Sequence, residues 1–166
     1  MNLLYSYSAK QQNRESVHPC EFEIKTISPG LGKWNIPKEQ KSKKDLLVRI
    51  MFSVLTGGKT TIVYAVDKDG SVMHTSYVVP RCMKFPFLRK GDLEIGPCAT
   101  LPEYRGRGIY PAVLRHICKT FANEDTVFYM IVNDQNIPSI RGIEKAGFEL
   151  CGTVKRSRFL KIYNRQ

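Results

Sequence analysis

Residues 92–122 read DLEIGPCATLPEYRGRGIYPAVLRHICKTFA, and this stretch decides the fold class. A strand is predicted at residues 92–100, after the basic loop at residues 81–91. A helix is predicted from about residue 108 to residue 122, because apolar residues recur on one side of it at Ile109, Val113, Leu114, Ile117 and Phe121. Pro111 suits the first turn of this helix, where no N–H is needed. We therefore expect a strand, a loop over residues 101–107 and a helix in succession.

The loop before this helix is a candidate anion-binding site. A helix N-terminus presents unsatisfied N–H groups and carries about half a positive charge. Gly106 and Gly108 have no side chain to block those amides, and Arg105 and Arg107 add positive charge. A P-loop is excluded because Gly108 is not followed by Lys-Ser/Thr, and a Rossmann fingerprint because position 111 is proline. We favour a pyrophosphate-binding turn, while an RNA-binding basic loop or a solvated turn stays open.

Further strands and helices surround this unit. Strands are predicted at residues 21–27, 60–66, 71–79, 127–132, 148–154 and 158–163, and helices at residues 38–55 and 138–145. The first helix carries one apolar face, made of Leu46, Leu47, Ile50, Met51, Val54 and Leu55. Residues 67–70 are a hairpin turn, and residues 1–20 receive no assignment. This order predicts an α/β (α+β) fold with one mixed, twisted sheet of about six to seven strands flanked by helices.

Length and composition bound the class of protein. A chain of 166 residues is expected to form one compact domain, residues 1–166. The net charge of +11 favours nucleotide cofactors, phosphorylated metabolites or nucleic acid as partners. No apolar run is long enough to span a bilayer and no signal peptide is apparent, so we expect a cytoplasmic protein without a membrane partner. The five cysteines contain no CxxC pair and the three histidines lack metal-ligand spacing, so neither a disulfide framework nor a metal site is expected.

Two motifs in this order resemble the GNAT superfamily of N-acetyltransferases. The first is the loop described above, where Pro102, Arg105 and Gly108 match the family and Tyr110 replaces its final small residue. The second begins at Asn136 and ends in the family's Lys-x-Gly-Phe pattern at residues 145–148. The resemblance covers a cofactor-binding core at residues 60–163, whereas residues 1–59 are a divergent N-terminal part. It implies a single GNAT-like domain whose central strands splay apart.

The resemblance also implies acetyl-coenzyme A (acetyl-CoA) as co-substrate and a set of residues that hold it. Strand 92–100 would receive the pantetheine arm, and Pro97 fits a strand whose pairing is interrupted. The backbone N–H of Cys98 would polarise the thioester carbonyl. The implied cofactor-binding residues are Cys98, Ala99, Thr100, Leu101, Arg105, Gly106, Arg107, Gly108, Ile109, Tyr110, Asn136 and Ser139.

Glu94 is the candidate general base, and the resemblance to the histone-acetyltransferase branch of the family supports it. Strand alternation places Glu94 and Cys98, four residues apart, on one face. A plain salt bridge from Glu94 to a lysine or arginine is the alternative. The family's thiolate-protonating tyrosine is replaced by Ile143. The remaining options are that water or a hydroxyl of Tyr129, Tyr110 or Ser139 protonates the thiolate, or that the thiolate leaves unprotonated.

These residues predict an acetyl-CoA-dependent N-acetyltransferase that acts on a primary amine of a small metabolite, an amino sugar or a protein. The basic aromatic loop at residues 81–90 can hold a phosphorylated or nucleotide-linked acceptor, or be a solvated loop with apolar anchors. The alternatives are a nucleic-acid-binding module, which the apolar setting of Phe128 and Tyr129 disfavours, and a catalytically silent CoA-binding protein. A homodimer is left open.

Overall fold

The computed structural model describes residues 1–11, 22–28, 43–158 and 161–166. These residues form one eight-stranded sheet in the order β2-β3-β4-β5-β6-β1-β7-β8. The strands are β1 (Asn2–Ser8), β2 (Glu23–Ile27), β3 (Thr61–Val66), β4 (Val72–Pro80), β5 (Leu93–Thr100), β6 (Val127–Asn133), β7 (Glu149–Arg156) and β8 (Tyr163–Arg165). The helices are α1 (Lys43–Thr56), α2 (Ile109–Phe121) and α3 (Ile137–Lys145), with short 3₁₀ turns at Ala9–Gln11 and Pro102–Tyr104. The predicted mixed α+β class is confirmed.

The sheet has one strand more than predicted, because residues 2–8 form β1. This strand lies inside the sheet, antiparallel to both β6 and β7. Its neighbouring residues Leu4 and Tyr5 are both buried, so burial does not alternate along it as in a strand with one solvated face. Its partners are also at least 119 residues away, at residues 127–133 and 149–154. A local pattern therefore could not reveal it.

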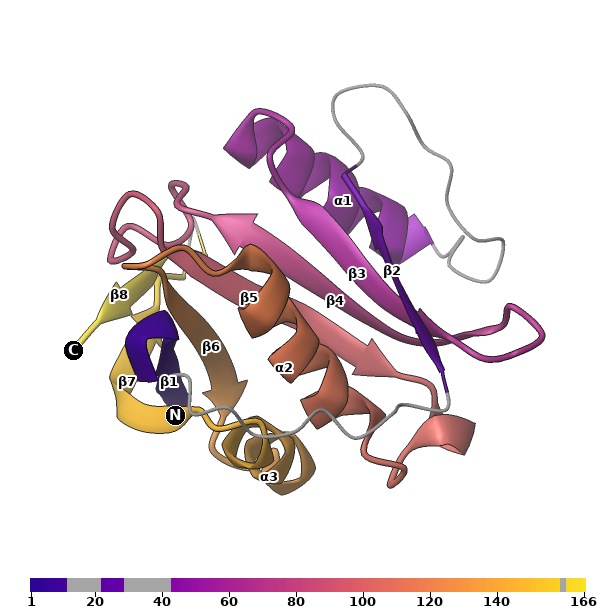
Figure 1. Cartoon of the computed structure of the whole chain (residues 1–166). Coiled ribbons are helices and arrows are strands. Elements are labelled where there is room, and N and C mark those ends of the chain that lie inside the picture. The colour runs from indigo at the N-terminus through magenta and orange to yellow at the C-terminus, as the bar shows by residue number, and fades with distance from the viewer. Residues whose placement is uncertain (12–21, 29–42, 159–160) are drawn as a thin grey trace.

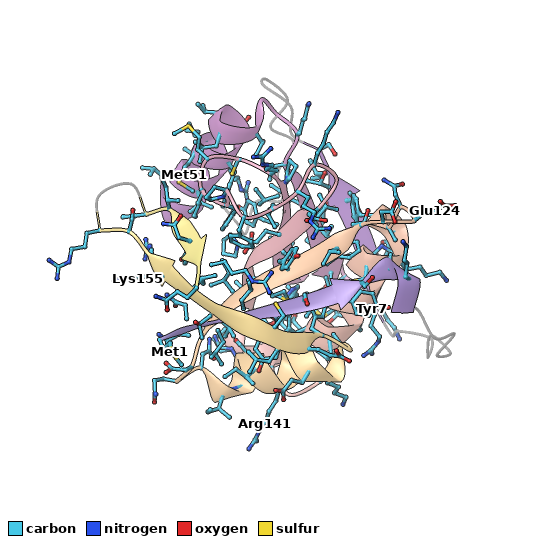
Figure 2. The ribbon with its side chains drawn as sticks, turned by 90° about the vertical axis from the view of Figure 1, so that its left-hand side faces the viewer. Met1, Tyr7, Met51, Glu124, Arg141 and Lys155 are labelled. Carbon is cyan, nitrogen blue, oxygen red and sulfur yellow. The ribbon has the colours of Figure 1, made fainter. Side chains whose placement is uncertain are left out.

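The helices cover the sheet in two layers (Figure 1). The face under α2 and α3 holds the main core, in which Val113, Leu114 and Ile117 of α2 are fully buried. A second cluster on the opposite face packs around Phe52 of α1. Figure 2 shows the two layers from the side, with Met51 of α1 and Arg141 of α3 on opposite sides of the strands. No helix in these described segments is long and apolar enough to cross a membrane.

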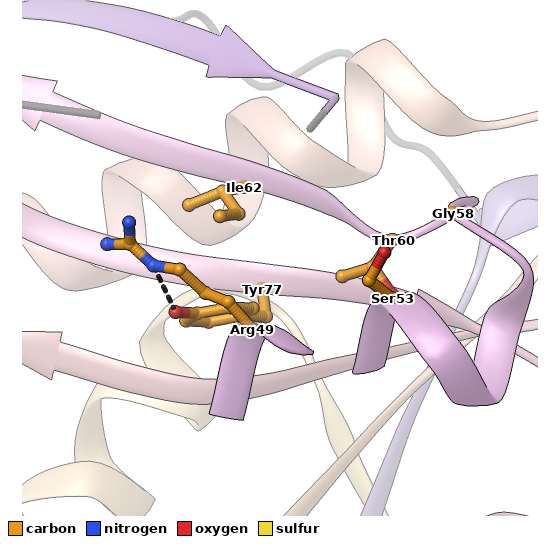
Figure 3. A pocket seen from close by; sticks show the side chains of 6 residues that line it. All are labelled: Arg49, Ser53, Gly58, Thr60, Ile62 and Tyr77. Atoms are coloured by element: carbon orange, nitrogen blue, oxygen red, sulfur yellow. Dashed lines mark hydrogen bonds between the residues drawn. The ribbon is translucent and has the colours of Figure 1, made fainter. Parts of the chain in front are cut away.

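Helix α1 turns a different face to the sheet than its sequence predicts. Four residues of the predicted apolar face, Leu46, Leu47, Ile50 and Val54, are exposed. The buried residues are instead Arg49, Phe52, Ser53 and Thr56. The Arg49 Nε donates a hydrogen bond of 3.1 Å to the hydroxyl of Tyr77 on β4, and Figure 3 shows this bond bridging helix and sheet. Burial of these polar groups is tolerated because they have hydrogen-bonding partners. The pattern of apolar residues in the sequence does not reveal such partners.

The predicted ends of the elements are largely confirmed. Helix α1 ends at Gly57-Gly58, both at positive φ, although its predicted start at residue 38 lies outside the described residues. The hairpin turn at residues 67–70 closes with a 2.9 Å bond from the Gly70 N–H to the Asp67 carbonyl. The last strand is an exception. It runs over Tyr163–Arg165 rather than residues 158–163, and residues 159–160 of that prediction are not described.

Candidate active site

The candidate site lies where β5 and β6 separate. These parallel strands pair only through Leu93 with Phe128 and Glu94 with Tyr129. Beyond Glu94, β5 stays paired with β4 on its other edge, so its edge toward β6 has free backbone groups. The predicted splay of the central strands is therefore present, just before Pro97.

A cavity of about 320 Å³ occupies this gap and has walls from both faces of the sheet. Its lining on the side of α2 and α3 includes Cys98, Tyr110, Ser139 and Ile143. Its lining on the side of α1 includes Met51, Phe52, Lys84, Phe85 and Tyr163. The cavity is therefore bordered by the helices on both faces of the sheet.

The predicted alternation along β5 is interrupted by a bulge. Ser76 pairs with Cys98 and Val79 pairs with Glu94, so a three-residue step on β4 faces a four-residue step on β5. Ser76 and Val79 lie on opposite faces of the sheet, and Cys98 and Glu94 must do the same. The prediction that Glu94 and Cys98 share a face is therefore wrong. Both still line the cavity, because it passes through the gap between the strands.

Glu94 is a buried carboxyl group that forms no ion pair with any described residue. Its residue is 4% exposed, and its Oε2 accepts no hydrogen bond from any described residue. Burial raises its pKa from 4.5 to about 8, and the positive charge of Lys84 opposes this rise. The salt bridges found among the described residues do not include Glu94, so the structure gives no support to a plain ion pair. Gly96 leaves room for the carboxyl, since a Cβ there would lie 2.8 Å from Oε1.

The side chain of Cys98 belongs to a buried hydrogen-bonded chain. The Ser76 hydroxyl donates to the Cys98 sulfur over 3.1 Å, and Ser76 Oγ lies 2.7 Å from His74 Nε2. His74 Nδ1 lies 2.6 Å from the Thr100 hydroxyl. Burial lowers the pKa of His74 to about 4 and raises that of Cys98 to about 12, so both are neutral at pH 7. A neutral thiol is a poor nucleophile, which agrees with a backbone role for Cys98.

Tyr110 points into the interior rather than into the anion-binding loop. Its ring lies 5.4 Å from the ring of His74 and packs on Gly142, where a Cβ would lie 2.5 Å from Cδ1. Its hydroxyl is hydrogen-bonded to the Cys98 thiol, and burial raises its pKa. The replacement of the family's small residue by Tyr110 therefore leaves the loop open and places a hydroxyl at the cavity wall.

The loop at the start of α2 has the geometry of an anion-binding nest, here residues 106–110. Gly106 and Gly108 adopt φ of 77° and 74°, and Gly108 is the helix N-cap. Within the described part of the chain, the backbone amides of residues 106–110 donate no hydrogen bond. Arg105 is held against β5 by a 3.2 Å bond from Nε to the Thr100 carbonyl, and Arg107 stacks on Tyr104 at 5.3 Å. Free amides beside two guanidinium groups are suited to a phosphate group.

The free edge of β5 leads from this nest to the cavity. The Leu101 N–H donates to the Met73 carbonyl on β4, over 3.0 Å. Since backbone direction alternates along a strand, the N–H groups of Thr100 and Cys98 point away from β4 into the gap. Ala99 and Thr100 connect the cavity at Cys98 with the loop. The structure thus places the predicted residues 98–101 along one edge, while their binding role stays a prediction.

The comparisons with known proteins agree with this geometry. The model of the acetyltransferase (GNAT) family matches residues 56–148, more than half of the chain. This protein belongs to the GNAT acetyltransferase family. A search of curated proteins gave no significant match.

Solved GNAT structures share the fold at low sequence identity. A GNAT-family acetyltransferase from Colwellia psychrerythraea is 16% identical with a TM-score of 0.60, and the alignment covers 90% of this chain and 52% of that one. A tandem GNAT protein from the clavulanic acid biosynthesis pathway is 13% identical with a TM-score of 0.59, covering 90% and 50%. A phosphinothricin acetyltransferase from Sinorhizobium meliloti, in complex with acetyl-CoA, is 20% identical with a TM-score of 0.54, covering 84% and 83%. The chain thus spans about half the length of the first two.

The second GNAT motif forms the wall of the cavity opposite β5. Asn136 caps α3, and its Oδ1 accepts a 3.4 Å hydrogen bond from the Ser139 N–H. Both residues line the cavity, as does the fully buried Ile143. The structure therefore brings Asn136 and Ser139 to the cavity that Cys98 and Glu94 border. Their contact with a cofactor stays a prediction.

Several residues in or beside this cavity were not identified from the sequence of this GNAT protein. His74 and Ser76 lie beside it in a buried strand, where Ser76 contacts Cys98, and Phe52 and Tyr163 line it from elements that only the fold brings together. Lys84 also lines it and belongs to the predicted acceptor loop at residues 81–90. The signal that could have revealed His74 and Ser76 was the presence of polar residues within the otherwise apolar strand at residues 71–79. Of the candidate proton donors, Tyr110 and Ser139 line the cavity, whereas Tyr129 packs on Phe87 outside its lining.

Proposed function

We propose that this protein transfers an acetyl group from acetyl-CoA to a primary amine of a small molecule. The observation that carries the proposal is Glu94, a buried carboxyl that forms no ion pair with a described residue, in a cavity between two splayed strands. Buried carboxyls with a raised pKa are typical of proton-transferring sites. The four described cysteines are free thiols, which suits a reducing compartment such as the cytoplasm.

Residues of the nest and of the β5 edge would hold acetyl-CoA, which supplies an activated acyl group. The amides of residues 106–110, with Arg105 and Arg107, would bind its pyrophosphate. Residues 98–101 would bind the pantetheine arm along the free edge of β5, and Asn136 and Ser139 would contact it from the opposite wall. The presence of acetyl-CoA in the S. meliloti GNAT enzyme supports this choice of co-substrate.

Glu94 would prepare the amine for attack. An alkyl amine has a reference pKa of about 10, so it is mostly protonated at neutral pH. A carboxylate whose pKa is raised to about 8 is a stronger base than an ordinary glutamate and is still partly ionised at pH 7. Glu94 faces α1, opposite Cys98, so the amine would enter from the α1 side.

The backbone and Tyr110 would stabilise the reacting thioester. The Cys98 N–H points into the gap and would donate to the thioester oxygen as negative charge develops on it. The Tyr110 hydroxyl lies at the same wall of the cavity as the Cys98 thiol. We assign Tyr110 as the residue that would protonate the departing coenzyme A thiolate. Ile143, at the family's tyrosine position, cannot donate a proton.

Thermal unfolding and a thiol-release assay test this function. Acetyl-CoA at about 100 times its Kd should stabilise the protein by about 2.7 kcal/mol, which corresponds to a Tm rise of roughly 5–10 °C. Amines should then release free coenzyme A thiol at rates above hydrolysis. Stabilisation by an oligonucleotide alone would support the nucleic-acid alternative, and binding without transfer across an amine panel would support the silent binder.

A further inference from the structure

The α1 side of the cavity holds a lysine whose charge is only partly compensated. Lys84, in the loop between β4 and β5, places its Nζ 4.6 Å from the ring centroid of Phe52 and 5.5 Å from that of Phe85. The side chain is half-buried, and burial lowers its pKa. Aromatic faces attract a cation, but they do not replace the hydrogen bonds that an ammonium group makes in water.

Lys84 forms no ion pair with a carboxylate of any described residue. None of the salt bridges among the described residues involves it, and Glu94 interacts with it only electrostatically. Glu94 is itself mainly protonated at pH 7, since its pKa is raised to about 8. Among the described residues, the ammonium group in the cavity therefore has no anionic partner at pH 7.

Further cations surround the same end of the cavity. Arg156 and Lys161 both act on Lys84 as like charges. Arg156 stacks on Tyr163 at 5.9 Å, and the Tyr163 N–H donates to the Lys84 carbonyl over 3.0 Å. Strand β7, the residues just before β8 and the β4–β5 loop thus bring three positive side chains near one another, close to the rings of Phe85 and Tyr163. Such a field attracts small anions.

We propose that Lys84 binds an anionic group of the acceptor, a carboxylate or a phosphate, while the acceptor's amine lies at Glu94. The acceptor is then a small amine that carries a negative group a few bonds away, as in an amino acid or an aminoalkyl phosphate. The cavity of about 320 Å³ must also admit the thioester, which limits the enclosed part of the acceptor to this size. This inference rests on the proposed function and assigns its substrate class.

Matched amines test the charge requirement. Purified protein is assayed with acetyl-CoA and amino acids, their neutral amides, aminoalkyl phosphates and the corresponding amino alcohols. The anionic members of each pair should have kcat/KM about 10- to 100-fold above the neutral members, the range expected for a hydrogen-bonded charge pair. The carboxylate and phosphate arms identify which anion is preferred.

Variants of Lys84 connect that preference to the residue. In Lys84→Met, which keeps an apolar chain against Phe52, the ratio between anionic and neutral amines should collapse through a rise in KM for the anionic ones. Lys84→Arg should restore most of the ratio. Lys59→Met removes the same charge from an exposed lysine outside the cavity lining and should leave the ratio unchanged.

The outcomes separate this inference from the proposed function. Equal acetylation of charged and neutral amines, or an unchanged ratio in Lys84→Met, would overturn the assignment of Lys84 and leave the transferase standing. If no amine in the panel is acetylated, the proposed function fails and the inference fails with it.

Discussion

Replacing Glu94 by glutamine should abolish most activity and at the same time stabilise the fold. Glu94 is 4% exposed and its Oε2 accepts no hydrogen bond from a described residue, so ionising it inside the protein is costly. A rise of its pKa from 4.5 to about 8 amounts to about 5 kcal/mol, at about 1.4 kcal/mol per unit. This conversion sets an upper value, because the surroundings relax.

The sign of the pH dependence follows from linkage. The folded-state pKa is the higher one, so the contribution of Glu94 to stability is fully present below pH 4.5 and is lost as pH rises toward 8. Glutamine does not ionise and avoids this loss. The stability difference between Glu94→Gln and wild type should therefore be near zero at pH 4, about 3 kcal/mol at pH 7 and about 5 kcal/mol at pH 9.

Urea unfolding and initial rates measure the two effects on the same preparations. The rate of wild type should rise through pH 8 as Glu94 ionises, and Glu94→Gln should lose about 10²- to 10⁴-fold of that rate. Glu124→Gln, at an exposed site, is the matched control and should change neither quantity. Equal stability of Glu94→Gln and wild type at pH 9, or a rate within a factor of about three, would refute the reasoning.

Three further substitutions test the other parts of the site. Cys98→Ala should keep most of the activity, because the proposed donor is a backbone N–H, and mass spectrometry during turnover should find no acetyl-cysteine at this position. Tyr110→Phe should lower kcat about tenfold or more with little change in the KM for acetyl-CoA; an unchanged kcat would mean that the thiolate leaves unprotonated. Gly108→Ala, at φ 74°, should cost about 1–2 kcal/mol of stability and also weaken acetyl-CoA binding. Gly70→Ala, at φ 86° in the hairpin turn at residues 67–70, should lower stability without changing acetyl-CoA binding. Calorimetry can measure both the unfolding and the binding.

Local sequence patterns were sufficient for the elements that carry the GNAT motifs. The strand–loop–helix at residues 92–122 and the helix ending before Gly147 appear as predicted, because their signals are periodicity, glycine and proline. Helix α1 differs because hydrogen bonds, such as that from Arg49 to Tyr77, allow polar residues to face the sheet. Strand β1 differs because its partners are distant in sequence.

The candidate site was predictable only where one motif contains it. Gly106 and Gly108 act within a single loop, so their arrangement could be read directly from the sequence. The bulge that places Glu94 and Cys98 on opposite faces depends on the register between β4 and β5, which no single strand reveals. In the sequence, Lys84 is likewise only one residue of a basic loop. Its place in the cavity depends on β8 and α1, which the fold brings next to it.

The nest at the start of α2 can be observed directly by NMR. Acetyl-CoA added to ¹⁵N-labelled protein should shift the amide resonances of residues 106–110 most strongly, together with that of Cys98, because these N–H groups are the proposed donors to its pyrophosphate and to its thioester oxygen. Saturating acetyl-CoA that leaves these six resonances in place would contradict the account, whether or not other residues respond.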